Sequence, residues 1–234
     1  MKLLTVGANT KINKSDASGQ GYLTAILHLA PSGLSGHQVC PWSSEGCRQA
    51  CLNTAGRGRF SNVQDARIRK TKMFFEQRDE FIRLLVNDIQ AFVRKCEREG
   101  LEPVIRLNGT SDILWERIPI GTHKSIFQMF PYIQFYDYTK APPSKRRAEP
   151  NYSLVYSRAS DMQKADLIGA LWDGGKVAVV FSGELPAYYW GYPVVDGDKH
   201  DLRFLDPSGS IIGLSAKGLA KKDTSGFVVH QRAA

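Results

Sequence analysis

Three cysteines lie within twelve residues of one another, in the segment Cys40-Pro-Trp-Ser-Ser-Glu-Gly-Cys47-Arg-Gln-Ala-Cys51. Soft thiolates select zinc or iron–sulfur clusters, and three of them this close along the chain can face one ion or cluster. A fourth thiolate is missing nearby. Either His37 completes a zinc site, or one iron of a [4Fe–4S] cluster stays open for a substrate or cofactor. The plain alternative is a cysteine-rich turn without metal.

Carboxylates and a histidine form a second group of residues that could do chemistry. Asp112 follows a predicted strand, and Asp196 and Asp198 lie close to His200 in the sequence. Carboxylates gathered at the mouth of a barrel can act as nucleophile or general base. We therefore predict Asp112, Asp196, Asp198 and His200 as catalytic residues. The alternative for Asp196-Gly-Asp198 is a simple turn, which Asp-Gly steps favour.

The elements that must position these residues alternate between strand and helix patterns. Apolar runs predict strands over 22–30, 103–107, 133–138, 153–156 and 176–181, with two short ones over 193–195 and 202–205. Helical spacing predicts helices over 62–75, 78–99, 123–130 and 161–172. We infer an α/β protein: one domain over residues 1–234, folded as a partial or full (β/α) barrel with mostly parallel strands, whose cysteine loop spans 31–60.

Polar side chains collect where these predicted strands end. In parallel α/β folds the chemistry lies at the carboxyl ends of the strands, so these positions favour an enzyme. The predicted contacts to substrate or cofactor are Arg106, Asn108, Ser111, Asp137, Lys140, Arg158, Ser182 and Tyr189. The fourth cysteine, Cys96, instead falls on the apolar face of its helix beside Phe92 and Val93, and we predict a buried core thiol there.

Composition sets the class of protein and of partner. The chain has 234 residues, 42% of them hydrophobic and 23% charged, which excludes a disordered or low-complexity scaffold. Its net charge of +8 would attract a polyanion such as DNA, RNA or a nucleotide. Basic residues cluster in 67–72, 140–147 and 217–222, and the aromatic group 188–190 suits stacking on an unpaired base. DNA or a nucleotide is thus the expected substrate, and protein partners are open.

The sequence also bears on location. It contains no run of about 20 apolar residues, so we expect no membrane helix, and residues 1–11 are too short and polar for a signal peptide. We therefore expect a cytoplasmic protein. Thiols stay reduced in that compartment, which favours metal binding or catalysis by the clustered cysteines over disulfides.

The place of the cysteines, between the first long strand and the first helix, resembles that of the cluster loop in radical S-adenosylmethionine enzymes, which are partial (β/α) barrels. The resemblance implies a [4Fe–4S] cluster on Cys40, Cys47 and Cys51, with S-adenosylmethionine as a possible cofactor. The segment 106–112 falls where that superfamily binds the methionyl group. The spacing here, Cys-x6-Cys-x3-Cys, departs from the usual Cys-x3-Cys-x2-Cys of that family.

Most of the chain resembles a family of small phage-encoded proteins with no assigned reaction. The residues that carry the resemblance are Cys40-Pro41 with Cys47 and Cys51, then the segments 106–112, 135–140, 196–204 and 213–218. It implies a viral context, with the host cytoplasm as the place of action, and makes modification of a genome or nucleotide a reasonable task.

Three functional hypotheses follow. The first is an iron–sulfur enzyme, similar to radical S-adenosylmethionine enzymes, that modifies a nucleobase or nucleotide, with DNA favoured; Asn108, Ser111 and Asp112 would contact cofactor or substrate. The second is a DNA base-exchange transglycosylase for 7-deazaguanine, resembling tRNA-guanine transglycosylase, with zinc and with Asp112 and Asp196 as nucleophile and proton donor. Residues 15–21 are faintly similar to the base-binding loop of those enzymes. The third is a non-catalytic, zinc-containing protein that binds nucleic acid.

Overall fold

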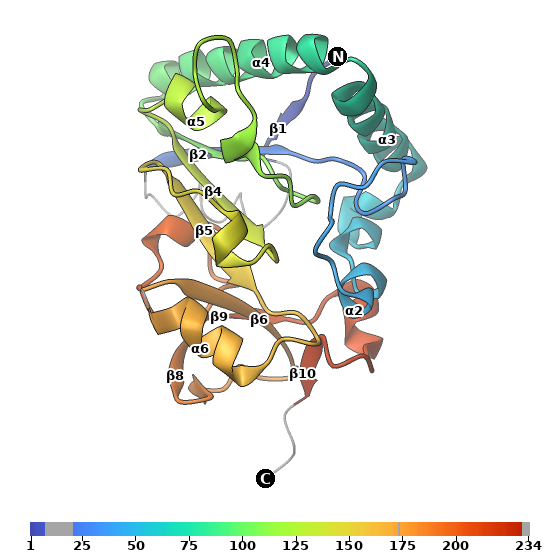
Figure 1. Cartoon of the computed structure of the whole chain (residues 1–234), viewed down its shortest axis with the longest axis vertical. Coiled ribbons are helices and arrows are strands. Elements are labelled where there is room, and N and C mark those ends of the chain that lie inside the picture. The colour runs from blue at the N-terminus through green and yellow to red at the C-terminus, as the bar shows by residue number, and fades with distance from the viewer. Residues whose placement is uncertain (8–20, 173, 231–234) are drawn as a thin grey trace.

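A ten-stranded sheet runs through the molecule in the computed structural model, which describes residues 1–7, 21–172 and 174–230 (Figure 1). The strands are β1 (Leu4–Val6), β2 (Tyr22–Leu27), β3 (Glu102–Arg106), β4 (Gln134–Thr139), β5 (Tyr152–Ser157), β6 (Lys176–Ser182), β7 (Tyr188–Tyr189), β8 (Tyr192–Asp196), β9 (Ile211–Ser215) and β10 (Val228–His230). Five helices accompany them in the described residues: α2 (Glu45–Gln49), α3 (Ser61–Glu76), α4 (Arg78–Glu99), α5 (Ile126–Met129) and α6 (Lys164–Trp172).

The strand order confirms a mixed α/β fold with mostly parallel strands. The order is β1-β2-β3-β4-β5-β6-β9-β8-β7, and every pair from β2 to β8 is parallel, while β1 and β7 pair antiparallel at the two ends. Strand β10 also pairs with β6, along its carboxyl half, where β5 has already ended. Among the described strands the sheet does not close on itself, so the full barrel is not seen.

The face of the sheet that carries α3 and α4 holds the largest apolar core. Strand β2 contributes Leu23, Ala25 and Leu27 to it, because alternate side chains of a strand point to one face. Helix α4 buries Phe81, Leu85, Ile89, Phe92, Val93 and Cys96 at helical spacing, so the predicted core thiol is confirmed. Gly100 ends the helix with φ +67°, a left-handed conformation that glycine adopts without steric cost.

The opposite face of β2–β4 is covered by an irregular segment instead of a helix. Val104 and Tyr136 pack there against Leu202 and Phe204. The strand expected over 202–205 is therefore wrong, because Arg203–Leu205 form a short 3₁₀ helix in which Phe204, with the preceding Leu202, packs on the sheet while Leu205 is exposed. The central strand β9 was not expected, since a short apolar run is ambiguous between strand, helix and loop.

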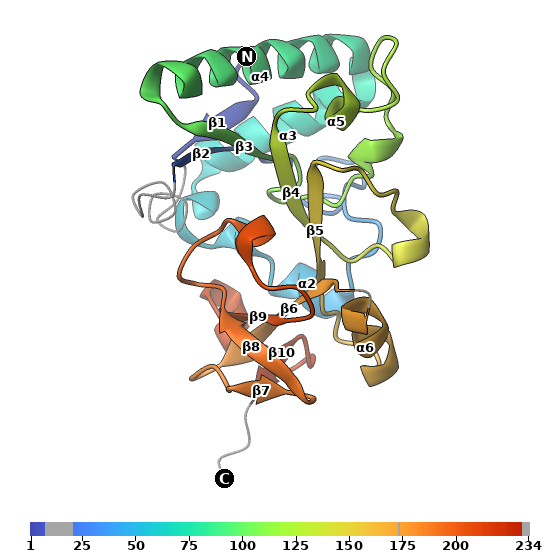
Figure 2. The ribbon, with the colours of Figure 1, turned by 90° about the vertical axis from the view of Figure 1, so that its left-hand side faces the viewer.

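Most other boundaries agree with the expected ones to within two residues. The exceptions are the strand expected over 22–30, which ends at Leu27, the helix expected over 123–130, reduced to α5, and the helix expected over 161–172, which begins at Lys164. Figure 2 shows α4 lying across one end of the molecule and β6–β10 at the other. In the described part of the chain no helix has the length and apolar character needed to cross a membrane.

Candidate functional site

The three clustered cysteines lie in an irregular segment between β2 and α3. Ser44 caps the short helix α2 by accepting a hydrogen bond from the backbone N–H of Cys47 at 3.2 Å. Cys51 in turn caps a 3₁₀ turn, its Sγ accepting from the N–H of Asn53 at 3.5 Å. Cys40 Sγ donates to the carbonyl oxygen of Thr110 at 3.7 Å, which ties the segment to the loop after β3. All four cysteines of the chain are thiols rather than disulfides.

The three thiols are partly buried and act on one another electrostatically. Burial, with a smaller effect of the charges of Cys51, Asp112 and Cys47, raises the pKa of Cys40 to about 12. Burial also raises the pKa values of Cys47 and Cys51. Without a cation the thiols therefore stay protonated. Within the described residues no group of three His, Cys, Asp or Glu side chains is already arranged as a metal site.

Two basic residues oppose this effect of burial. Lys140 lowers the pKa of Cys47, and Arg67 lowers that of Cys51. Lys140 Nζ donates to the carbonyl oxygens of Ser157 and Arg158 at 3.2 and 2.8 Å and to Ser157 Oγ at 3.0 Å. Arg67 donates to the side-chain oxygen of Asn53, while its buried Nε has no hydrogen-bond partner among the described residues. Both cations can therefore compensate negative charge at the cysteines.

The chain's last described segment packs onto the cysteine segment (Figure 1). Gly46 touches it so closely that a side chain there would overlap Ser225 Oγ and come within 3.0 Å of Phe227 Cβ. Ala50 shares a small apolar cluster with Ala220 and Val228. The cysteines are thus held between the carboxyl edge of the sheet and residues that lie about 170 positions later in the sequence.

Asp112 joins the loop after β3 to the end of β4. Its Oδ1 accepts from Thr139 Oγ1 and its Oδ2 from the N–H of Lys140, both at 2.8 Å, and Arg146 lies 3.7 Å away. Its own N–H donates to the carbonyl of Val39 at 2.7 Å, one residue before Cys40. Burial raises the pKa of Asp112. Both carboxylate oxygens are thus occupied in positioning this loop against the cysteine segment.

Asn108 and Ser111 organise that same loop from within. Asn108 Oδ1 accepts from Ser111 Oγ at 2.8 Å and from the N–H of Ile113 at 2.9 Å, and its Nδ2 donates to the carbonyl of Ile113. The backbone N–H of Asn108 donates to the buried carboxylate of Asp137 at 2.9 Å. Burial raises the pKa of Asp137 to about 7. These side chains set the backbone conformation rather than pointing into open space.

Arg106 is part of the covered face of the sheet. Its Nη1 donates to Asp201 Oδ2 at 2.9 Å, and Tyr136 donates its hydroxyl to the same oxygen at 2.9 Å. The guanidinium lies 5.0 Å from the ring centre of Tyr138. Arg106 of β3 and Tyr136 of β4 thereby fix the segment after β8 onto these two strands.

Asp196 ends β8, which lies five positions from β3 in the sheet order, and Asp198 and His200 belong to the segment that leads from β8 back to Asp201. Asp198 accepts from the N–H of Ser215 at 2.8 Å and from Lys217 Nζ at 2.7 Å, and its own N–H donates to Asp196. His200 Nδ1 lies 3.2 Å from Arg203 Nη2. These contacts describe a turn that fixes the ends of β8 and β9, in a different group from Asp112.

Arg158, Ser182 and Tyr189 lie beyond Lys140 along the carboxyl edge. Arg158 Nη1 donates to the carbonyls of Gly226 and Phe227 at 2.8 and 3.2 Å. The ring of Tyr189 stacks on Trp190 with centres 4.8 Å apart, a contact within the aromatic group, and stacking on a base stays a prediction. Ser182 Oγ lies 3.0 Å from Nδ1 of His230.

One residue at this edge, His230, carries no signal in the sequence. His230 Nε2 donates to the carbonyl of Asp223 at 2.9 Å. In the neutral ring Nδ1 then accepts a hydrogen bond from the hydroxyl of Ser182. Ser182 is predicted from its place at the end of a strand, whereas His230 stands near no motif and reaches this edge through the parallel pairing of β10 with β6. The basic stretch 67–72 includes Arg67, but the sequence does not indicate that the side chain of Arg67 points toward Asn53 and the cysteine segment.

His37, the alternative fourth metal ligand, is engaged elsewhere. Its ring stacks on Phe75 with centres 4.5 Å apart, and its Nε2 lies 3.2 Å from Glu76 Oε1. Residues 15–20 of the segment compared with the base-binding loop of transglycosylases lie outside the described residues.

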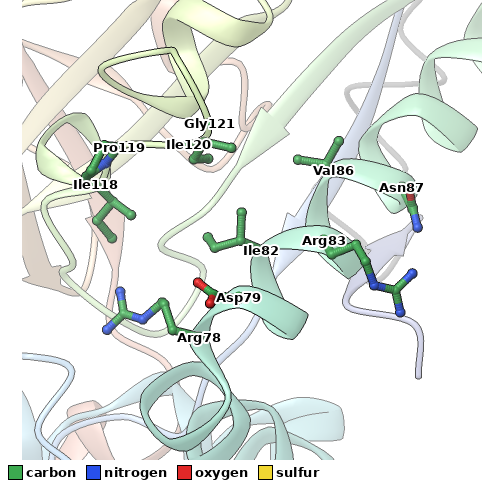
Figure 3. Close-up of a pocket in the computed structure, with 10 residues that line it drawn as sticks. All are labelled: Arg78, Asp79, Ile82, Arg83, Val86, Asn87, Ile118, Pro119, Ile120 and Gly121. Atoms are coloured by element: carbon green, nitrogen blue, oxygen red, sulfur yellow. The ribbon is translucent and has the colours of Figure 1, made fainter.

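Two hollows lie near the α3–α4 corner. One, of about 310 Å³, is lined by α4 residues and the segment 118–121, as Figure 3 shows, and contains none of the predicted site residues. The other, of about 300 Å³, is lined in part by Pro41, Trp42, Phe75 and Asp112 and so borders the cysteine segment.

Comparison with known proteins identifies the family to which the chain belongs. No curated protein and no solved structure matches the chain. The family model described as gene product 88 matches residues 2–231, nearly the whole chain, and is of the phage type that the resemblance implied. The chain therefore belongs to the gene product 88 family.

Proposed function

We propose that the protein is an iron–sulfur enzyme that modifies a nucleobase or nucleotide, with the cluster on Cys40, Cys47 and Cys51. The observation that carries the proposal is a set of three partly buried thiols that act on one another electrostatically, together with Lys140 and Arg67, at the carboxyl edge of parallel strands. In parallel α/β folds this edge is where reactions take place.

The residues fit such a cofactor by their chemistry. Soft thiolates bind iron–sulfur clusters, and a bound cation replaces the protons that burial otherwise keeps on the thiols. Lys140 and Arg67 provide positive charge beside the resulting thiolates. A [4Fe–4S] cluster held by three cysteines leaves one iron for another ligand, which the resemblance gives as S-adenosylmethionine, and supplies one-electron chemistry.

The chain's own residues would position the reactants. Asp112 holds Lys140 through the backbone N–H of that residue, and Lys140 keeps its ammonium on the ends of β5. Arg158 and Tyr189 extend this edge with a cation and an aromatic ring, groups that bind phosphate and a base respectively.

The same contacts weigh against the base-exchange alternative. A nucleophilic Asp112 needs a carboxylate oxygen open to a sugar carbon, whereas both oxygens accept short hydrogen bonds here. Asp196, the second carboxylate of that mechanism, belongs to the turn after β8. We therefore favour the iron–sulfur enzyme over a zinc transglycosylase or a zinc-containing binding protein.

The experiment is metal and sulfide analysis of protein purified without oxygen. We expect about four iron and four sulfide per chain, with the broad visible absorption of a cluster. Cys40→Ala, Cys47→Ala and Cys51→Ala should each lose the iron, while Cys96→Ala is the matched control and should keep it. One zinc without iron, or full iron in Cys47→Ala, would refute the proposal. Cleavage of S-adenosylmethionine by the reduced protein then tests the cofactor.

A further inference from the structure

We propose that a single-stranded nucleic acid lies across the cysteine segment, with its phosphates on a cationic rim built from two distant parts of the chain. The rim consists of Arg48, Arg57, Arg59, Lys217, Lys221 and Lys222, all of them exposed. The inference rests on the proposed function only for the reaction that follows binding, and it narrows the substrate from a nucleotide in general to a strand.

Packing, not sequence, brings the two halves of the rim together. The turn Leu52–Thr54 contacts both the next turn, Gly56–Arg59, and the turn Gly218–Lys222 near the end of the chain. At the junction a Cβ on Gly218 would lie 3.2 Å from the Cβ of Ala55, so the two backbones approach closely. Figure 1 shows the late segment beside α2.

The rim has few carboxylates of its own. Within 45–60 and 216–223 the acidic residues are Glu45 and Asp223, against six basic ones. Asp223 is buried and accepts from Ser225 and Val228. Lys217 is paired with Asp198 at 2.7 Å, which leaves the five other cations for a partner's phosphates.

Exposed apolar side chains lie among these cations. Leu52, Phe60 and Leu219 are 59%, 51% and 55% exposed. The guanidinium of Arg59 lies 5.6 Å from the ring centre of Phe60. Positive charge beside an exposed aromatic ring, here that of Phe60, is typical of surfaces that hold phosphates while an unpaired base stacks. Duplex DNA hides its base faces, and an enzyme that reacts with a base must take it out of the stack. These features favour a single strand over a duplex or an acidic protein.

Binding is tested with a fluorescent single strand of about 16 nucleotides, near the upper end of known site sizes, as DNA and as RNA. The variant R57Q/R59Q/K221Q/K222Q should bind at least about tenfold more weakly, and its slope of log K against log salt should be shallower by up to about three. The matched control K2Q/R94Q/R98Q/K124Q removes the same charge at the α4 end and should keep the wild-type slope.

Phe60→Ala separates stacking from charge. We expect binding of the single strand to weaken about fivefold or more, with an unchanged salt slope, because a stacked base is lost while the phosphate contacts remain. Equal losses in the rim and control variants would overturn the inference. So would tighter binding of the matching duplex, or equal affinity for polyglutamate.

Iron content of the same preparations keeps the two proposals apart. The rim variants should retain their iron. A protein that binds strands through the rim but holds no iron would refute the proposed function and leave this inference standing. If the protein holds an iron–sulfur cluster but the rim variants bind the single strand as tightly as the wild type, the proposed function would stand and this inference would be refuted.

Discussion

The end of the molecule that carries α4 and the end that carries the cysteines are built from different contacts. At the α4 end, large apolar side chains such as Phe81 and Phe92 interlock over regular strands. At the cysteine end, Gly46, Ala50 and Ala220 let backbone segments approach, and buried polar bonds fix them. Burial of large side chains supplies most of the folding free energy, so stability should depend on the first end and metal binding on the second.

The largest effect should come from Phe81→Ala, at the α4 end. The ring is fully buried and lies 5.2 Å from that of Phe74, so its loss should lower the free energy of unfolding by about 3–5 kcal/mol. Chemical denaturation measures this. Iron content in folded protein should not change; a parallel loss of iron would mean that the two ends are not separable.

Gly46→Val should produce the reverse pattern. Its side chain would push against Ser225 and Phe227, which costs about 1–3 kcal/mol and displaces the segment that covers the cysteines. Most of the iron should be lost. Gly169→Ala is the matched control, because no atom lies within 4 Å of a Cβ placed there. It should keep its iron and gain up to about 1 kcal/mol from better helix propensity. Normal iron content in Gly46→Val would contradict the expectation that metal binding depends on the packing at the cysteine end.

Asp137 should make stability depend on pH. Because burial raises its pKa to about 7, the folded protein keeps a proton that the unfolded chain releases at lower pH. This stabilisation is complete below the unfolded-state pKa and is lost as pH rises through about 7. From about pH 5 to about pH 8 the unfolding free energy of the wild type should fall by about 2 kcal/mol more than that of Asp137→Asn. Parallel pH profiles for the two proteins would contradict this.

A smaller effect is expected for Thr139→Val. The change removes the hydroxyl that donates to Asp112 at 2.8 Å and accepts from the N–H of Ala141 at 3.0 Å, while the bond from the N–H of Lys140 to Asp112 stays. The unfolding free energy should fall by about 1 kcal/mol. Thr110→Val, whose hydroxyl bonds the carbonyl of Leu29, gives a comparison outside the Asp112 pair. A double-mutant cycle with Asp112→Asn should show coupling for Thr139 only.

The smallest effect should come from Lys95→Ala on α4. Lys95 Nζ lies 2.6 Å from Glu99 Oε1 on an exposed helix face, and such pairs contribute about 0.3–0.5 kcal/mol.

Lys140→Met, which removes a buried ammonium beside Cys47, should instead weaken metal retention in a chelator challenge. If both substitutions left retention unchanged, Lys140 would have no part in compensating charge at the cysteines.

Periodicity predicted the α4 end well. The repeat from Phe81 to Cys96 gave the helix, its buried face and its end at Gly100, because one face of a helix recurs at fixed spacing. The parallel strands up to β6 followed from apolar runs between helices. Strands β7 and β10, of two and three residues, were too brief for a pattern. The apolar run of β9 was ambiguous between strand, helix and loop, although β9 is as long as β3.

The residue types of the site were visible, but their directions were not. Spacing along the chain identified Cys40, Cys47 and Cys51 as candidate ligands. The position of Lys140 directly after a predicted strand identified that residue as a candidate contact. No residue near Asp112 in the sequence indicates that both of its carboxylate oxygens accept hydrogen bonds, one from Thr139 and one from Lys140. A sequence gives a side chain's chemistry, whereas the packing of distant segments decides which of its atoms remain available.

The cover that residues 218–230 form over the cysteines has a consequence for how the protein is made. During synthesis, at roughly 5–20 residues per second, the cysteines emerge many seconds before the segment that packs on them. Through that interval the thiols are accessible to metal donors and oxidants alike. Maturation therefore has an open phase and a closed phase, and completion of β10 against β6 marks the change from one to the other.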